Sequence, residues 1–159
     1  PGRSFYTNTG ATQRYGIELT ALYNYQQWEL KTTFTQAKYL FKDNNNNLGT
    51  ALPGIPNSQI FLQLGYTLTN SLQFLISAEH IGDLYADNSN TVVVESFRRV
   101  RFQIAKSFNF NKLEISFSGG VNNLFNERYF DNIRLNAFGK RYYEPAPGRN
   151  AYLGFQIGI

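Results

Sequence analysis

Catalytic chemistry has little support among the residue types of this chain of 159 residues. The single histidine, His80, directly follows Glu79, and neighbours in a strand point to opposite faces, so the two cannot work as an acid–base pair. No carboxylate pair, nucleophile elbow or glycine-rich phosphate loop is present. The absence of cysteine excludes disulfides and thiolate metal sites, and one imidazole cannot build a histidine-rich site. We therefore expect no catalysis, no metal site and no cofactor.

Binding chemistry is concentrated in one loop near the C-terminus. This loop combines cations with aromatic rings: Phe138, Lys140, Arg141, Tyr142 and Tyr143. Cations bind anionic groups, and aromatic faces stack on flat or cationic ones, so the loop could hold an anionic or aromatic ligand. A polar loop beside an interfacial belt of aromatic side chains would have the same composition, and both interpretations stay open. Nucleic acid is not expected as a partner, because the net charge is only +4 and the one dense basic run is Arg98-Arg99-Val100-Arg101.

The elements that would position this loop are β-strands. Apolar and polar residues alternate with a period of two along most of the chain, which is typical of strands. The pattern predicts eight antiparallel strands and no helix: Arg14–Tyr25, Trp28–Leu40, Gln59–Thr69, Leu72–Glu79, Phe97–Phe108, Leu113–Val121, Tyr129–Leu135 and Asn150–Ile159. Long connections are expected at Phe41–Ser58, Gly82–Glu95 and Asn136–Gly148, with a short strand near Val92–Val94.

The alternation fits two kinds of protein, a soluble sandwich with its apolar face inward and a membrane barrel with its apolar face toward lipid. Most polar faces carry isolated charges, as the lumen of a wide barrel would: Glu18, Glu29, Lys31, Glu79, Arg99, Arg101, Glu114 and Arg134. Aromatic residues make up 16% of the chain, which suits interfacial girdles as well as a β core. No run of about 18 apolar residues is present, so no helix is expected to span a bilayer.

Four segments carry a family resemblance. In chain order they are Leu52–Asn57, Gly82–Tyr85 continuing to Asn90-Thr91, Asn123-Leu124-Phe125 followed by Tyr129, and Tyr143–Arg149 before the last strand. The combination resembles the C-terminal end of TonB-dependent outer-membrane receptors. One departure is the final Ile159, where the family commonly ends in an aromatic residue that the barrel assembly machinery recognises. Asn123, Pro145, Pro147 and Gly148 suit tight backbone geometry, and we expect them to be structural and not to bind ligand.

The resemblance implies an all-β, antiparallel, up-and-down transmembrane β-barrel. Residues 1–159 would be its C-terminal part, about eight of roughly 22 strands, with the N-terminal plug and earlier barrel strands absent. The start at Pro1, without initiator Met or export signal, also suggests a fragment. The implied function is TonB-energised uptake of a ferric siderophore, haem, cobalamin or similar nutrient across the outer membrane of a Gram-negative cell. The implied partners are outer-membrane lipid, the plug and remaining strands of the same receptor, TonB through the absent N-terminal region, the barrel assembly machinery, and a small-molecule or metal-chelate ligand.

The resemblance also implies a side of the membrane for each loop. The C-terminus of such receptors lies in the periplasm, so counting back through eight strands places Asn122–Arg128, Gly82–Glu95 and Phe41–Ser58 on the periplasmic side. Asn136–Gly148 becomes extracellular, together with the turns at Gln26, Asn70 and Asn109. Two long connections then lie inside, against the usual pattern of long extracellular loops. Arg99 and Arg101 point inward and are expected to contact the plug.

Two other functions remain open on the residues alone. A complete small eight-stranded outer-membrane barrel would have a structural or adhesion role. A soluble lipocalin-like module would bind a ligand in an apolar interior beneath a polar exterior. An isolated piece of a larger barrel would instead leave two unpaired edge strands and a lipid-facing apolar band, so we expect it to aggregate, pair with copies or close into a nonnative barrel.

Overall fold

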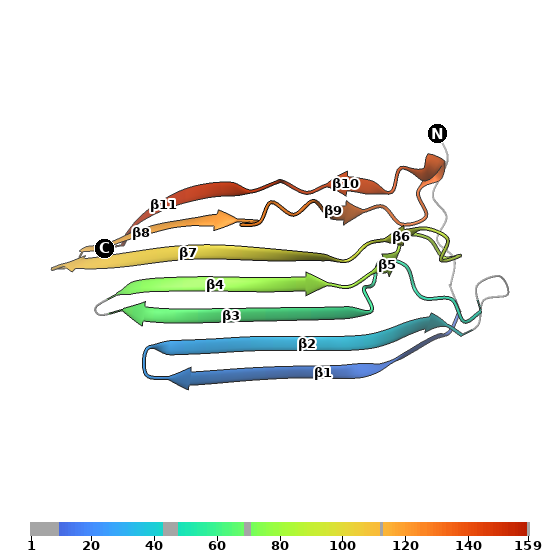
Figure 1. The fold of residues 1–159 in the computed structure, drawn as a ribbon, viewed down its shortest axis with the longest axis horizontal. Helices are drawn as coiled ribbons and strands as arrows, with labels where there is room; N and C mark the ends of the chain where they lie inside the picture. Colours follow the sequence, from blue (N-terminus) through green and yellow to red (C-terminus); the bar gives the residue numbers. More distant parts are fainter. Residues whose placement is uncertain (1–9, 43–47, 69–70, 112, 159) are drawn as a thin grey trace.

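Seven long antiparallel strands form one open sheet, in which each strand pairs with the next along the chain (Figure 1). The computed structural model describes residues 10–42, 48–68, 71–111 and 113–158. In sheet order the strands are β1 (Thr12–Tyr25), β2 (Trp28–Phe41), β3 (Ser58–Leu68), β4 (Leu72–Ile81), β7 (Phe97–Phe110), β8 (Leu113–Asn122) and β11 (Asn150–Gly158). The predicted all-β antiparallel fold is confirmed, and the strand bounds agree with the alternation to within a few residues.

Short elements lie beyond one end of this sheet. They are β5 (Leu84–Tyr85), β6 (Val93–Val94), β9 (Phe130–Ile133), β10 (Tyr143–Pro145) and the 3-10 turn η1 (Phe138–Lys140). β5 pairs with β6, and β9 pairs with β10, each as a separate two-stranded ribbon. No helix in the described part of the chain is long and apolar enough to cross a membrane.

The sheet is a single layer without a core of its own. Among the described residues, only Phe41, Ala86 and Val94 are buried apolar side chains, whereas Ile17 and Leu19 of β1 are 62% and 61% exposed. β1 and β11 lie at opposite edges of the sheet, so the strands do not close on themselves. Neither a complete small barrel nor a lipocalin-like module, which both need a closed wall around an interior, is favoured by this arrangement.

The two faces of the sheet differ in chemistry because paired residues lie on the same face. The apolar residues of each strand are therefore aligned with those of its neighbours. One row of paired residues is apolar or aromatic throughout: Tyr23, Leu30, Leu64, Ile76, Phe102, Val121 and Ala151. The next row, on the other side of the sheet, is mostly polar or small: Asn24, Glu29, Gly65, Leu75, Gln103, Gly120 and Tyr152. We call these sides the apolar face and the polar face.

The predicted strand Tyr129–Leu135 does not cross the sheet. Its ordered part, β9, continues in the direction of β8 beyond the end of that strand, and β10 leads back into β11 (Figure 1). A turn separates β8 from β9, in which Asn123 and Asn126 adopt positive φ angles of 51° and 56°. The turn interrupts one long strand and does not reverse it. The prediction of eight strands in the wall was therefore too high by one.

This miscount reversed the predicted placement of three segments and of the short turns. The connections after β2, β4 and β8 all lie at one end of the sheet, and the short turns near Gln26, Ser71 and Asn111 lie at the other end with the C-terminal end of β11 (Figure 1). Phe41–Ser58, Gly82–Glu95 and Asn122–Arg128 therefore share an end with Asn136–Gly148, and the short turns share an end with the last residues of β11, both against the prediction. We call the two ends the loop end and the turn end. The predicted turn residue Asn70 and the terminal Ile159 lie outside the described residues.

Candidate functional site

Hydrogen bonds join the three connections at the loop end into one platform. Asn90 holds the backbone of Ala51 from both sides: the Ala51 N–H donates to Asn90 Oδ1 at 2.6 Å, and Asn90 Nδ2 donates to the Ala51 carbonyl at 2.9 Å. The Gly54 N–H donates to the Tyr85 carbonyl at 2.8 Å. The connection after β2 is thereby fastened to the connection after β4.

The connection after β8 is fastened to the same platform through Asn136. The Asn136 N–H donates to the Ala86 carbonyl at 2.9 Å, and the Asn88 N–H donates to Asn136 Oδ1 at 2.9 Å. Asn136 Nδ2 in turn donates to Asn88 Oδ1 at 3.1 Å. Loops that are ordered before a ligand arrives lose less conformational entropy on binding, so this platform is suited to hold binding groups in place.

Asp87 organises the centre of the platform. Its carboxylate accepts hydrogen bonds from the N–H groups of Thr91 and Val92, at 2.9 and 2.8 Å, and from the Thr91 hydroxyl at 2.7 Å. Burial alone would raise the pKa of the Asp87 carboxyl, but these hydrogen bonds outweigh it and hold the pKa below its ordinary value. A carboxyl with a lowered pKa stabilises the loop while it is ionised and loses that contribution on protonation.

We predict a pH dependence of local order at this loop. Above the ordinary carboxyl pKa of about 3.9, the Thr91 and Val92 amides are expected to be protected from hydrogen exchange, and protection should fall as the pH drops through the lowered pKa of Asp87. Asp87→Asn keeps one acceptor oxygen but cannot ionise, so its protection factors should be independent of acid pH. Measurement on the whole receptor by exchange and mass spectrometry checks this. If protection fell equally at low pH in the unchanged receptor and in Asp87→Asn, the loss of protection would come from another titratable group.

Two of the four segments that carried the family resemblance, the Asn123 turn and Tyr143–Arg149, meet in a clamp around the buried Asn123. Asn123 is 2% exposed, and its side chain bonds both the N–H and the carbonyl of Glu127 at 2.8 Å. Asn126 Oδ1 accepts the Arg149 N–H at 2.9 Å, and a Cβ on Gly148 would approach that same oxygen to 2.9 Å. The structural role expected of Asn123 and Gly148 is confirmed. The clamp fixes where the chain leaves β8 and where it enters β11.

A charged and aromatic cluster lies on the polar face next to this clamp. Arg99 pairs with Glu79 at 2.5 Å and donates to the Tyr129 hydroxyl at 2.9 Å. The Tyr129 ring stacks on Phe97 with centroids 4.2 Å apart. Arg99, which was expected to contact the plug, is thus held by partners in this chain, and that contact stays a prediction. Arg101 is exposed on the same face.

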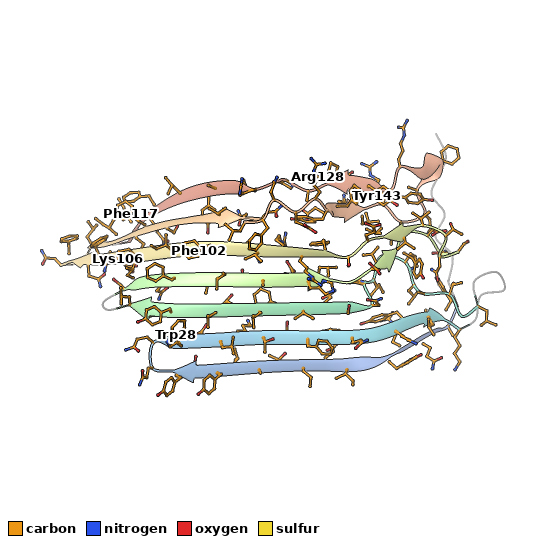
Figure 2. All side chains as sticks on the ribbon, in the orientation of Figure 1. Trp28, Phe102, Lys106, Phe117, Arg128 and Tyr143 are labelled. Carbon is orange, nitrogen blue, oxygen red and sulfur yellow. The ribbon has the colours of Figure 1, made fainter. Side chains whose placement is uncertain are left out.

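A hollow of about 310 Å³ opens beside the cluster, where β9 and β10 lie over the segment that enters β7. Among the described residues, its walls include one cation, two anions and four aromatic rings: Arg128, Glu95, Glu127, Phe97, Tyr129, Phe130 and Tyr143. Phe130 and Tyr143 stack with centroids 4.5 Å apart and an interplanar angle of 25°. Figure 2 shows Arg128 and Tyr143 close to each other on this part of the chain. A second hollow of about 430 Å³ shares Glu127 to Phe130.

This arrangement can bind a flat or anionic molecule. Stacked rings present faces to a planar group, and an exposed guanidinium can form paired hydrogen bonds with carboxylate or catecholate oxygens. Across residues 10–42, 48–68, 71–111 and 113–158, no three His, Cys, Asp or Glu side chains lie close enough together to hold a metal ion.

Four of the five predicted ligand residues have described side chains, and one of these four lines the hollow. Tyr143 lines it, and the Tyr142 ring lies 6.0 Å from that of Tyr143. Phe138 is fully exposed at the tip of the loop, and Arg141 is exposed just after η1. Lys140 is the last residue of η1. Binding by these residues stays a prediction.

The sequence interpretation missed the run from Arg128 to Phe130. The available signal was a cation followed by two aromatic residues directly after the Asn123 turn. Because Tyr129–Leu135 was assigned to a wall strand, these side chains were not considered as binding groups.

Comparison with known proteins places the chain among membrane receptors. A family model described as TonB dependent receptor-like, beta-barrel matches residues 1–124. The probable TonB-dependent siderophore receptor PiuA of Acinetobacter baumannii is 30% identical over 105 residues, which are 66% of this chain and 13% of that protein. The solved ferric citrate transporter FecA, 18% identical, matches 92% of the chain with a TM-score of 0.82 and is covered over 24% of its length. The siderophore receptor PiuA from Acinetobacter baumannii, 22% identical, matches 91% with a TM-score of 0.75, over 21% of its length.

Proposed function

The chain belongs to the TonB-dependent receptor-like β-barrel family, and on this basis we propose that it is the C-terminal part of an outer-membrane receptor that captures and imports a ferric siderophore or a similar nutrient. Its seven strands would form about a third of a barrel of roughly 22 strands. The free edges of β1 and β11 would pair with the remaining strands of the same receptor. The plug, contact with TonB and assembly by the barrel machinery belong to this proposal.

The family is one of receptors and transporters, and we propose no catalytic role for this segment. The observation that best supports a ferric siderophore or similar chelate as the ligand is the hollow at the loop end. Ferric siderophores bring iron already chelated, often through catecholate or carboxylate oxygens. Arg128 would offer such a complex a positive charge, and the stacked pair of Phe130 and Tyr143 would offer it aromatic faces.

The proposed orientation places the loop end outside the cell and the turn end in the periplasm. Barrels of this kind have long extracellular loops and short periplasmic turns, and the corrected order of loops follows that rule. Aromatic side chains gather on the apolar face at the turn end, where Trp28 lies 4.5 Å from Tyr66, and Phe117 lies 5.1 Å from Phe155, between ring centroids. Figure 2 shows Trp28, Lys106 and Phe117 toward that end. Such a girdle marks a membrane interface.

Uptake of iron tests this function. The whole receptor would be expressed in a Gram-negative strain without other siderophore receptors and supplied with radiolabelled iron as catecholate, hydroxamate or citrate complexes. We expect accumulation of at least one complex that requires both the receptor and TonB. Accumulation of none, or accumulation that is equal without TonB, would contradict the proposal.

A further inference from the structure

The apolar face contains a hollow that the receptor function does not use. It measures about 650 Å³ and spans β7, β8 and β11. The residues that form its apolar lining are Phe102, Ile104, Gly119, Val121, Ala151 and Leu153. Figure 2 shows Phe102 at the middle of the sheet. The hollow therefore lies within the band that faces the hydrocarbon of the membrane.

The hollow exists because one position lacks a side chain. Gly119 pairs with Ile104 on one side and with Leu153 on the other, so a large side chain there would fill the space between them. A Cβ on Gly119 would approach Leu153 Cδ2 to 3.0 Å and would next meet the Tyr152 carbonyl at 3.5 Å. A hollow of this size with walls of apolar side chains is suited to a hydrocarbon chain.

A cation stands above the hollow on the same face. Arg98 precedes Phe102 by four residues, which is about 13 Å along a strand, toward the loop end. Its guanidinium is exposed, and none of the ion pairs among the described residues involves it. The paired residue on β4 is His80, whose ring Nδ1 donates to the Phe97 carbonyl at 3.2 Å. On β7 the apolar face thus changes from Val100 to a basic group at Arg98.

We propose that the hollow and Arg98 together bind one membrane lipid with an anionic phosphate headgroup. The acyl chain would lie between Ile104 and Leu153, over Gly119, and the phosphate would accept hydrogen bonds from the Arg98 guanidinium. The order of the two features along the sheet, apolar space below and cation above, matches the order of tail and headgroup in a bilayer leaflet. The proposal rests on the proposed function for the placement of this sheet in the outer membrane, and the proposed orientation gives the leaflet, which would be the outer one.

Lipid counting on the purified whole receptor tests this site. The receptor in nonionic detergent would be titrated with palmitoyl-oleoyl phosphatidylglycerol, and bound lipids would be counted by native mass spectrometry. Phosphatidylcholine, which has the same chains and no net charge, is the matched lipid. We expect one phosphatidylglycerol to bind at least about fivefold more tightly than phosphatidylcholine.

Two variants separate the two parts of the site. Arg98→Gln removes the charge, and Gly119→Leu fills the hollow, so each should weaken the tightest phosphatidylglycerol binding at least about fivefold. Gly119→Ala serves as a milder filling variant if the leucine prevents insertion. Arg14→Gln, on the polar face, removes the same charge elsewhere and should leave lipid binding unchanged. Undiminished binding by Arg98→Gln or by the filled variant, or equal binding of both lipids, would overturn the site.

The same proteins distinguish this proposal from the receptor function. Both lipid-site variants should reach the outer membrane and import the same iron complex as the unchanged receptor, because neither residue lines the loop-end hollow. Failure of iron uptake in every protein, with intact lipid selectivity, would contradict the proposed function and leave the lipid site standing. A receptor dimer seated on this face in place of lipid would overturn the lipid site.

Discussion

Replacing Arg128 with glutamine in the whole receptor is expected to weaken binding of the imported iron complex by about tenfold or more. A hydrogen bond to a charged group contributes about 1.5–3 kcal/mol, and 1.4 kcal/mol corresponds to about tenfold in affinity. Among the residues that the structure describes, Arg128 is the one guanidinium in the wall of the loop-end hollow, beside the stacked Phe130 and Tyr143. Its charge is therefore expected to act directly on an anionic chelate.

Arg141→Gln is the matched control for this prediction. Arg141 belongs to the same connection and carries the same charge, but it does not line the hollow. Its removal should change the affinity by less than about twofold, because exposed charges interact weakly in water. Binding of the radiolabelled complex to cells without energy measures both variants. A larger loss for Arg141 than for Arg128 would move the site to the tip of the loop, as the sequence alone predicted.

Ile76→Arg is expected to destabilise the receptor by about 2–4 kcal/mol, because it places a charge at the middle of the lipid-facing band of the barrel. Ile76 lies on the apolar face, 42% exposed, in the fully apolar row that crosses the sheet from Tyr23 to Ala151. Its paired neighbours are Leu64 and Phe102, and neither can solvate a guanidinium. Unfolding of the purified receptor by denaturant in detergent or lipid, followed by tryptophan fluorescence, measures the change.

Gln73→Arg is the control on the same strand. Gln73 is exposed on the polar face, opposite Thr67 and Ala105. A charge there meets the lumen, so its effect should stay within about 0.5 kcal/mol, as for an ordinary surface change. Equal losses for the two variants would mean that the apolar face is not the one in contact with lipid.

The strands were predictable because a period of two residues depends only on local geometry and on one face being apolar. β1 begins at Thr12 where the alternation began at Arg14, and β7 ends at Phe110 where the alternation ended at Phe108. These differences lie at strand ends, where backbone hydrogen bonds can extend the ladder by a residue or two whatever the side chains are.

The path of the last hairpin was not predictable from alternation. Whether the chain reverses or continues after β8 depends on the backbone at Asn123 and Asn126, whose side chains bond Glu127 and Arg149. The first contact is local but leaves the alternation unchanged, and the second joins residues 23 apart in the sequence, so the pattern indicates neither. The loop-end hollow was missed because Tyr129–Leu135 was assigned to a wall strand, whereas Tyr129 stacks on Phe97 of β7.

Cysteine labelling on intact cells tests most directly that this segment spans the outer membrane with its loop end outside. The sequence contains no cysteine, so single sites can be introduced into the segment without background from it. Phe138→Cys at the tip of the last loop should react with a membrane-impermeant maleimide on intact cells, and Gln27→Cys at the turn end should react only after the outer membrane is opened. Labelling of Gln27→Cys but not Phe138→Cys on intact cells, or of both alike, would contradict the account.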